Sequence, residues 1–259
     1  MTQIDLKGMR LHYVLEGAEG APVLVLSNSL GTDLTMWDPQ IPEFVNRFRV
    51  LRYDTRGHGQ SSAPPGYYSI AQLAGDVLDL LNKLKIEQAF FCGLSMGGMI
   101  GQWLGVHAAD RMRKLVLANT AAKAGTAEEW NNRIAAVQTG GLKAMVPTLL
   151  DRWFTPAFRA ANPEAVARTS RMLYSADLQG YVGCCAAIRD MDQRDMVRSI
   201  GVPSLIVAGK YDQATPPQEG RFLAEQIAKA RYIELPTAHL SNIEAPDKFT
   251  SGVLEFLTA

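Results

Sequence analysis

The feature that most constrains the fold of this chain is a repeated alternation of short apolar segments with segments of helical periodicity. Strands are expected at 22–26, 49–53, 89–92 and 114–118, and the first of these is a continuous apolar run typical of a strand buried on both faces. Apolar residues recur at helical spacing in 70–84 and 96–106. This rhythm predicts an α/β fold, with a mostly parallel central sheet and helices on both faces. An earlier antiparallel strand is expected at 11–15.

The pattern changes after residue 121. From 125 to 195 no buried strand is expected, and helices are predicted at 127–139, 142–152, 163–174 and 178–190, punctuated by prolines. The strand pattern returns at 203–208, followed by a helix near 218–229, a strand at 230–235 and a closing helix around 246–257. The chain is therefore predicted to form one core from residues 1–121 and 197–259, interrupted by an inserted helical cap at 122–196.

Charge and cysteine content favour a cytoplasmic protein. The 26 basic and 26 acidic residues cancel, so no global field attracts nucleic acid or an anionic membrane, and neither partner is expected. The first ten residues lack a secretory pattern, and no apolar stretch reaches the roughly 18 residues that a membrane span needs. The three cysteines, Cys92, Cys184 and Cys185, are expected to be small buried side chains in a reducing compartment.

One short motif indicates catalysis. Gly93-Leu-Ser-Met-Gly97 follows a predicted strand and opens a predicted helix, which is the context of a G-x-S-x-G nucleophile elbow. A sharp strand-to-helix turn exposes the serine hydroxyl, and glycines are favoured two residues away because larger side chains would collide with neighbouring backbone. The helix N-terminus offers free N–H groups to an oxyanion. Ser95 is therefore the predicted nucleophile.

A serine needs a base within hydrogen-bond reach, and the chain has four histidines. His12 is expected at an edge or on the surface, and His58 lies in a glycine-rich turn. His107 lies twelve residues along the helix that follows the elbow, about 18 Å from Ser95, so it is too far away to act as the base. The elbow resembles that of the α/β-hydrolase fold, in which the catalytic histidine lies in a loop after a late strand. His239 lies in such a loop, after the last predicted strand. His239 is the predicted base.

The acid that orients this histidine is expected between Ser95 and His239, just after a strand. Asp212 meets that condition, and its predicted role is to hold the imidazole tautomer and stabilise the imidazolium. The other intervening aspartates fall in the helical insertion and are expected to be solvated; they include Asp151, Asp177, Asp190, Asp192 and Asp195. The second oxyanion donor is expected from the loop 27–31, so that the N–H of Leu30 pairs with that of Met96.

Longer stretches resemble one family of the α/β-hydrolase superfamily, the 3-oxoadipate enol-lactonases. The similarity is carried by 28–37, 52–61, 93–98, 130–134, 152–156, 209–212 and 238–242, which span nearly the whole chain. Many α/β-hydrolases carry His-Gly before the oxyanion residue, whereas this chain has Asn28-Ser29, as in the enol-lactonases.

The resemblance implies hydrolysis of a small anionic enol-lactone to 3-oxoadipate, through an acyl-enzyme, in the bacterial breakdown of aromatic acids. It implies no metal and no organic cofactor. On the resemblance, Arg133 is the first choice among the arginines to bind the substrate carboxylate, which a planar guanidinium can bind with two hydrogen bonds. The alternative is that Arg133 is a solvated arginine on a helix face. Trp130, Met145 and Trp153 are expected as apolar walls of the pocket.

Several alternatives share parts of this pattern. A carboxylesterase or a carbon–carbon bond hydrolase would use the same triad, and a non-catalytic ligand-binding module could retain the scaffold. Haloalkane dehalogenases and epoxide hydrolases use a carboxylate nucleophile, which Ser95 disfavours. The turn 57–62 nearly matches a dinucleotide-binding fingerprint but lacks its third glycine. Arg56 and His58 are therefore expected to be structural, and no oligomeric state is predicted.

Overall fold

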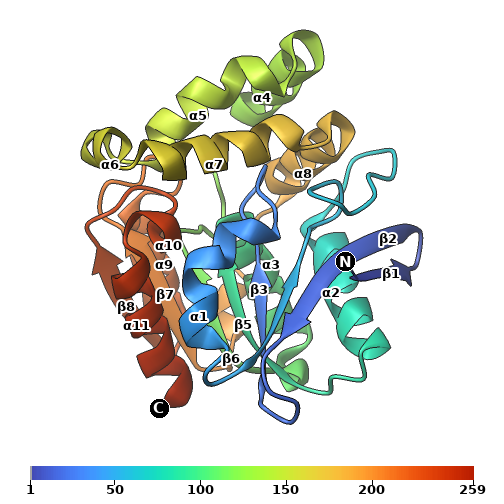
Figure 1. Cartoon of the computed structure of the whole chain (residues 1–259), viewed down its shortest axis with the longest axis vertical. Coiled ribbons are helices and arrows are strands. Elements are labelled where there is room, and N and C mark those ends of the chain that lie inside the picture. The colour runs from blue at the N-terminus through green and yellow to red at the C-terminus, as the bar shows by residue number, and fades with distance from the viewer. Residues whose placement is uncertain (1) are drawn as a thin grey trace.

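The computed structural model describes residues 2–259 and contains a central sheet between two layers of helices (Figure 1). Within that range, eight strands form one sheet in the order β1-β2-β4-β3-β5-β6-β7-β8. β2 is antiparallel to both β1 and β4, and the other five described strand pairs are parallel, so the sheet is mostly parallel, as predicted. The strands are β1 Thr2–Leu6, β2 Met9–Glu16, β3 Val23–Ser27, β4 Arg49–Tyr53, β5 Ala89–Leu94, β6 Met112–Ala118, β7 Ser204–Gly209 and β8 Ala230–Leu235.

The central strands form the core because their apolar side chains are buried on both faces of the sheet. Nearly every residue of β3, β5 and β7 is buried, whereas β8 at the edge is only partly covered. Leu24, Phe91 and Leu117 have no exposed surface. This burial explains why these segments are continuous apolar runs in the sequence.

Helices cover both faces of the sheet. α2 (Ile70–Lys83), α3 (Met96–His107) and α9 (Pro217–Gln226) lie on one face, and α1 (Ile41–Phe44) and α11 (Pro246–Thr258) lie on the other (Figure 1). The short helix α10 packs against α11 and spans Ser241–Glu244. Three 3₁₀ segments complete the core: η1 Leu34–Gln40, η2 Ala109–Arg111 and η4 Val197–Ser199.

The segment between β6 and β7 is helical, as its periodicity indicates. It consists of α4 Ala127–Gly140, η3 Leu142–Met145, α5 Val146–Trp153, α6 Pro156–Ala161, α7 Pro163–Ser175 and α8 Leu178–Asp190. α4 to α7 lie across one end of the sheet, at the top of Figure 1, and α8 lies beside them. We call α4 to α8 the cap helices. The division of the chain at residues 121/122 and 196/197 stays a prediction.

The expectation that His12 lies at an edge or on the surface is wrong. β2, which carries His12, lies between β1 and β4, and the His12 side chain is only 4% exposed. Its Nδ1 lies 2.7 Å from Oδ2 of Asp54. The error has a physical cause: β1 is a mostly polar five-residue segment that the apolar pattern did not predict, and it covers the edge of β2.

Three other expectations concern burial and hydrophobic length. All three cysteines are buried, as predicted. In the part of the chain that the structure describes, no helix combines the length and the apolar character that crossing a membrane requires. The five aspartates that were expected to be solvated are exposed.

Candidate active site

Ser95 occupies a strained turn between β5 and α3. Its backbone angles, φ 57° and ψ −115°, lie in a region that residues other than glycine rarely adopt. A Cβ added at Gly93 would lie 2.1 Å from the carbonyl oxygen of Gly97, and a Cβ added at Gly97 would lie 2.2 Å from that of Ser27. The steric reason for glycine on both sides of the elbow is therefore confirmed.

His239 and Asp212 form a buried hydrogen-bonded pair. Nδ1 of His239 donates to Oδ2 of Asp212 over 2.8 Å, and both side chains are almost fully buried. This bond leaves Nε2 of His239 as the nitrogen available to a hydroxyl, which is the tautomer that a general base needs.

The Asp212 carboxylate is surrounded by further donors. Oδ1 accepts the N–H groups of Ala214 and Thr215 at 2.8 and 2.9 Å, and Oδ2 accepts the Thr215 hydroxyl at 2.9 Å. Burial raises the pKa of Asp212, but the interaction with His239 and these hydrogen bonds outweigh it, so the pKa lies below its ordinary value. Asp212 is therefore held as an anion beside the imidazole.

Asn119 is a site residue that the sequence analysis missed. Its Nδ2 donates to Oδ2 of Asp212 and to the carbonyl of Ala238, each over 3.1 Å, and its Oδ1 accepts the hydroxyl of Ser241. Asn119 has a positive φ of 44° and follows β6 directly. It therefore links the loop of the acid to the loop of the histidine. A signal existed in the sequence, because a polar residue followed a buried strand at the edge that carries Ser95.

The loop after β3 presents the amide of Leu30 beside the elbow. In residues 2–259, neither the Leu30 amide nor the Met96 amide donates to another group of the protein, so both are free to bind an oxyanion. The next amide, that of Gly31, donates to Nε2 of His58 over 2.9 Å. His58 thus holds this loop, and Arg56 forms a buried ion pair with Asp76, so both residues of the turn have the structural contacts expected of them.

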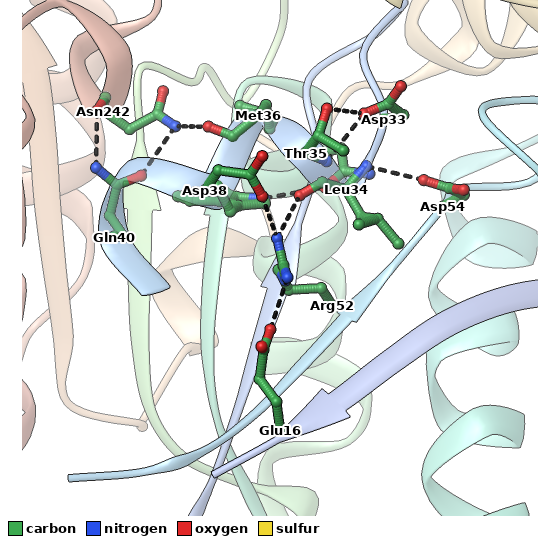
Figure 2. Close-up of polar contacts among 12 residues, drawn as sticks. Glu16, Asp33, Leu34, Thr35, Met36, Asp38, Gln40, Arg52, Asp54 and Asn242 are labelled. Carbon is green, nitrogen blue, oxygen red and sulfur yellow. Dashed lines mark hydrogen bonds and ion pairs between the residues drawn. The ribbon is translucent and has the colours of Figure 1, made fainter. Parts of the chain in front are cut away.

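The same loop continues into η1, which polar contacts hold on several sides (Figure 2). Asp54 accepts the N–H of Leu34 over 2.8 Å, and Arg52 lies 2.6 Å from Asp38. Asn242, three residues beyond His239, donates to the carbonyl of Met36 over 2.8 Å. These contacts connect the segment after the Leu30 loop to the loop that carries His239.

A cavity of about 650 Å³ lies between the sheet and the cap helices. Ser95, His239 and Leu30 line it on the sheet side. All four residues predicted for the substrate pocket line it on the cap side: Trp130, Arg133, Met145 and Trp153. Asp212 does not line the cavity, because it lies behind His239. Glu129 and Arg152, which were not predicted as pocket residues, also line it.

Elsewhere the described part of the chain offers no comparable combination of groups. A hollow of about 670 Å³ beside β1 is lined by residues such as Gln3, Asp5 and Arg10 and includes none of the predicted catalytic side chains. Among residues 2–259, no three His, Cys, Asp or Glu side chains cluster in a way that could hold a metal ion. The cavity over Ser95 is therefore the candidate active site.

Comparisons of sequence match this chain to known proteins over most of its length. The family model described as alpha/beta hydrolase fold matches residues 22–246. The protein named 3-oxoadipate enol-lactonase 2 of Acinetobacter baylyi is 44% identical over 250 residues, which cover 96% of this chain and 94% of that protein.

Two solved structures are similar over all or nearly all of their length. The enol-lactonase from Burkholderia xenovorans LB400 is 46% identical with a TM-score of 0.98, and the match covers 100% of both chains. A thermophilic esterase from Thermogutta terrifontis, solved with malate bound, is 26% identical with a TM-score of 0.93, over 100% of this chain and 98% of that chain.

Proposed function

The chain belongs to the alpha/beta hydrolase family, and from that membership we propose that it is a serine hydrolase that opens the enol-lactone of 3-oxoadipate through an acyl-enzyme. Near-full-length similarity to named enol-lactonases makes it a hydrolase of the ester and lactone class. The observation that carries the finer proposal is the shared cavity of Ser95 and His239, with the His239 imidazole bonded to a buried Asp212 anion. The proposed setting is the bacterial breakdown of aromatic acids.

In the proposed first half of the reaction, Oγ of Ser95 attacks the lactone carbonyl carbon while Nε2 of His239 takes the hydroxyl proton. The amides of Leu30 and Met96 stabilise the tetrahedral oxyanion. The ring C–O bond then breaks, and the enol oxygen receives the proton from His239. The product of this half is a Ser95 ester whose acyl chain still carries the released enol, which becomes the ketone.

In the second half, water attacks the Ser95 ester and gives its proton to His239. Collapse of the second tetrahedral intermediate returns that proton to Oγ of Ser95 and frees 3-oxoadipate. The low pKa of Asp212 supports this cycle, because an anion stabilises the imidazolium that forms in each half.

Arg133 is the proposed binding group for the substrate carboxylate. It lines the cavity, and within residues 2–259 it has no acidic partner. The guanidinium therefore brings a positive charge that no acid among the described residues pairs with. Glu129, Arg152 and the apolar rings of Trp130 and Trp153 line the same cavity. That combination suits a small apolar ring with one carboxylate.

The experiment is a substrate comparison with Arg133→Ala. The change removes the carboxylate contact, so KM for the anionic enol-lactone should rise about 10- to 100-fold, as expected for a hydrogen bond to a charged group. The effect on a neutral chromogenic ester should be much smaller. Steady-state kinetics on both substrates measures the difference.

Arg168→Ala is the matched control, because Arg168 is an exposed arginine of α7 outside the cavity lining. Equal losses on both substrates would assign Arg133 a packing role instead. A wild-type protein that hydrolyses neutral esters well and the enol-lactone poorly would favour a carboxylesterase, and turnover of vinylogous diketones would favour a carbon–carbon bond hydrolase.

A further inference from the structure

Arg133 is held by a buried tyrosine rather than by an acid. Nε of Arg133 donates to the hydroxyl oxygen of Tyr181 over 2.9 Å, and Nη2 donates to the same oxygen. Tyr181 lies on cap helix α8 and has no exposed surface. The guanidinium carbon also lies 5.1 Å from the ring centroid of Trp130 and 5.4 Å from that of Tyr181. Arg133 is therefore oriented by two rings and one hydroxyl.

The chemical nature of this partner matters for the charge of the cavity. An aspartate or glutamate at the same place would also orient the guanidinium, but it would cancel its charge. A phenol accepts the same two hydrogen bonds while remaining neutral. Burial raises the pKa of Tyr181 to about 12, although the nearby Arg133 opposes this shift, so the phenol stays protonated at neutral pH. The full positive charge of Arg133 is left for a ligand.

Tyr181 also contacts the loop that carries the oxyanion amide. A Cβ added at Gly31 would lie 3.1 Å from Cε2 of Tyr181, so the ring packs directly against this glycine. Gly31 follows Leu30 and is tied to His58 through its own N–H. One rigid side chain thus touches both the arginine of the cap and the Leu30 loop of the core.

We propose that Tyr181 is a positioning residue for substrate selection: it holds Arg133 with its charge uncompensated and at a set distance from the oxyanion amides, and so favours lactones that carry a carboxylate over neutral esters. This inference rests on the proposed function, because it assigns the reason why Arg133 can act as a carboxylate site. It adds a residue that does not itself need to contact the substrate.

Tyr181→Phe tests the proposal by removing one hydroxyl while keeping the ring against Gly31. KM for the anionic enol-lactone should rise about tenfold, with a much smaller change in kcat, because Arg133 loses the acceptor that orients it. The loss of kcat/KM on a neutral ester should be at least about fivefold smaller than the loss on the enol-lactone. Equal losses on the two substrates would overturn the proposal.

A double-mutant cycle with Arg133→Ala separates this role from packing. If Tyr181 acts through Arg133, Tyr181→Phe should change KM by less than about twofold in the Arg133→Ala background. The same tenfold effect in both backgrounds would overturn the proposal. Arg133→Lys is a second variant that leaves Tyr181 in place. Lysine keeps the positive charge but lacks the planar guanidinium, which donates two hydrogen bonds to the Tyr181 hydroxyl oxygen. Arg133→Lys should therefore also raise KM for the enol-lactone.

The outcomes separate this proposal from the function on which it rests. If Arg133→Ala leaves KM for the enol-lactone unchanged, the carboxylate site itself is wrong. If Arg133→Ala raises KM and Tyr181→Phe does not, only the role of Tyr181 is wrong.

Discussion

At the scale of single residues, the Leu30 loop, which is proposed to bind the oxyanion, depends on the protonation state of His58. Nε2 of His58 accepts the N–H of Gly31, and its Nδ1 lies 3.2 Å from the carbonyl oxygen of Arg56. A neutral ring with its proton on Nδ1 satisfies both contacts, whereas a protonated ring could not accept from Gly31. Burial lowers the pKa of His58, although the Arg56 carbonyl and Asp54 oppose the shift. The ring is thereby kept in the form that holds the loop.

This shift predicts a loss of stability at acid pH. The unfolded chain protonates His58 near its ordinary pKa of about 6.5, while the folded protein resists protonation, so the unfolded state binds more protons and gains stability as pH falls. The free energy of unfolding should therefore drop below about pH 6.5, with a limiting slope of about 1.4 kcal/mol per pH unit from this group. Urea unfolding of the wild type and of His58→Gln between pH 5 and 7.5 measures it.

The variant should show the shallower pH dependence, because glutamine does not titrate. His107→Gln serves as the control, since His107 is exposed at the end of α3. Identical slopes for wild type and His58→Gln would show that His58 titrates alike in both states.

At the scale of elements, the cap helices bond directly to the loops of the proposed triad. The carbonyl of Trp153, at the end of α5, accepts the N–H groups of His239 and Leu240 at 3.1 and 3.2 Å. Arg152 donates to the carbonyl of Gln213 over 2.7 Å, one residue after Asp212. The end of α5 therefore positions both loops as well as lining the cavity.

A second contact between the cap helices and the core lies where α8 packs against the turn after β4. Gly57 and Gly180 pack backbone against backbone: a Cβ at Gly180 would lie 2.2 Å from the carbonyl oxygen of Gly57. Gly180→Ala should therefore destabilise the protein by about 1–3 kcal/mol, because neither backbone can yield without moving α8 or the turn. Thermal unfolding followed by circular dichroism would measure the change.

Gly75→Ala is the matched control for this prediction. Gly75 lies inside α2, and a Cβ there meets nothing within 4 Å. Alanine at this helix position should stabilise the protein by about 0.5–1 kcal/mol. A Gly180→Ala protein as stable as the Gly75→Ala protein would contradict the close packing of Gly180 against Gly57.

The elements that the sequence predicted and those that it missed differ in length and burial. The central strands and the longer cap helices have enough apolar periodicity to be predicted, with ends displaced by a few residues. β1 has five mostly polar residues, α6 has six and α10 has four, so none shows a full apolar repeat. These short elements form because the rest of the fold supplies their packing.

The candidate site divides in a similar way. Ser95, Asp212 and His239 each follow a recognisable strand, so local sequence was sufficient to propose them. Asn119 and Tyr181 act through partners 93 and 48 residues away in the sequence, respectively. The position of Asn119 directly after a buried strand marks it as a candidate, but its partner depends on how distant segments pack. Tyr181 has no periodic or spacing signal in a single sequence.

At the scale of the whole molecule, the site exists because parallel strands end at the same edge of the sheet. Ser95 follows β5, Asp212 follows β7 and His239 follows β8, and the cap helices lie across that end of the sheet (Figure 1). The proposed chemistry therefore requires the complete sheet and the cap together.

The most direct test is the turnover of 3-oxoadipate enol-lactone by Ser95→Ala, compared with wild type at the same protein concentration. Loss of the ultraviolet absorbance of the lactone follows the reaction, and circular dichroism verifies that the variant is folded. Removal of the hydroxyl that is proposed to form the acyl-enzyme should lower kcat by about 10⁴-fold or more. A folded Ser95→Ala protein that retains a kcat within about tenfold of wild type would contradict the proposed mechanism.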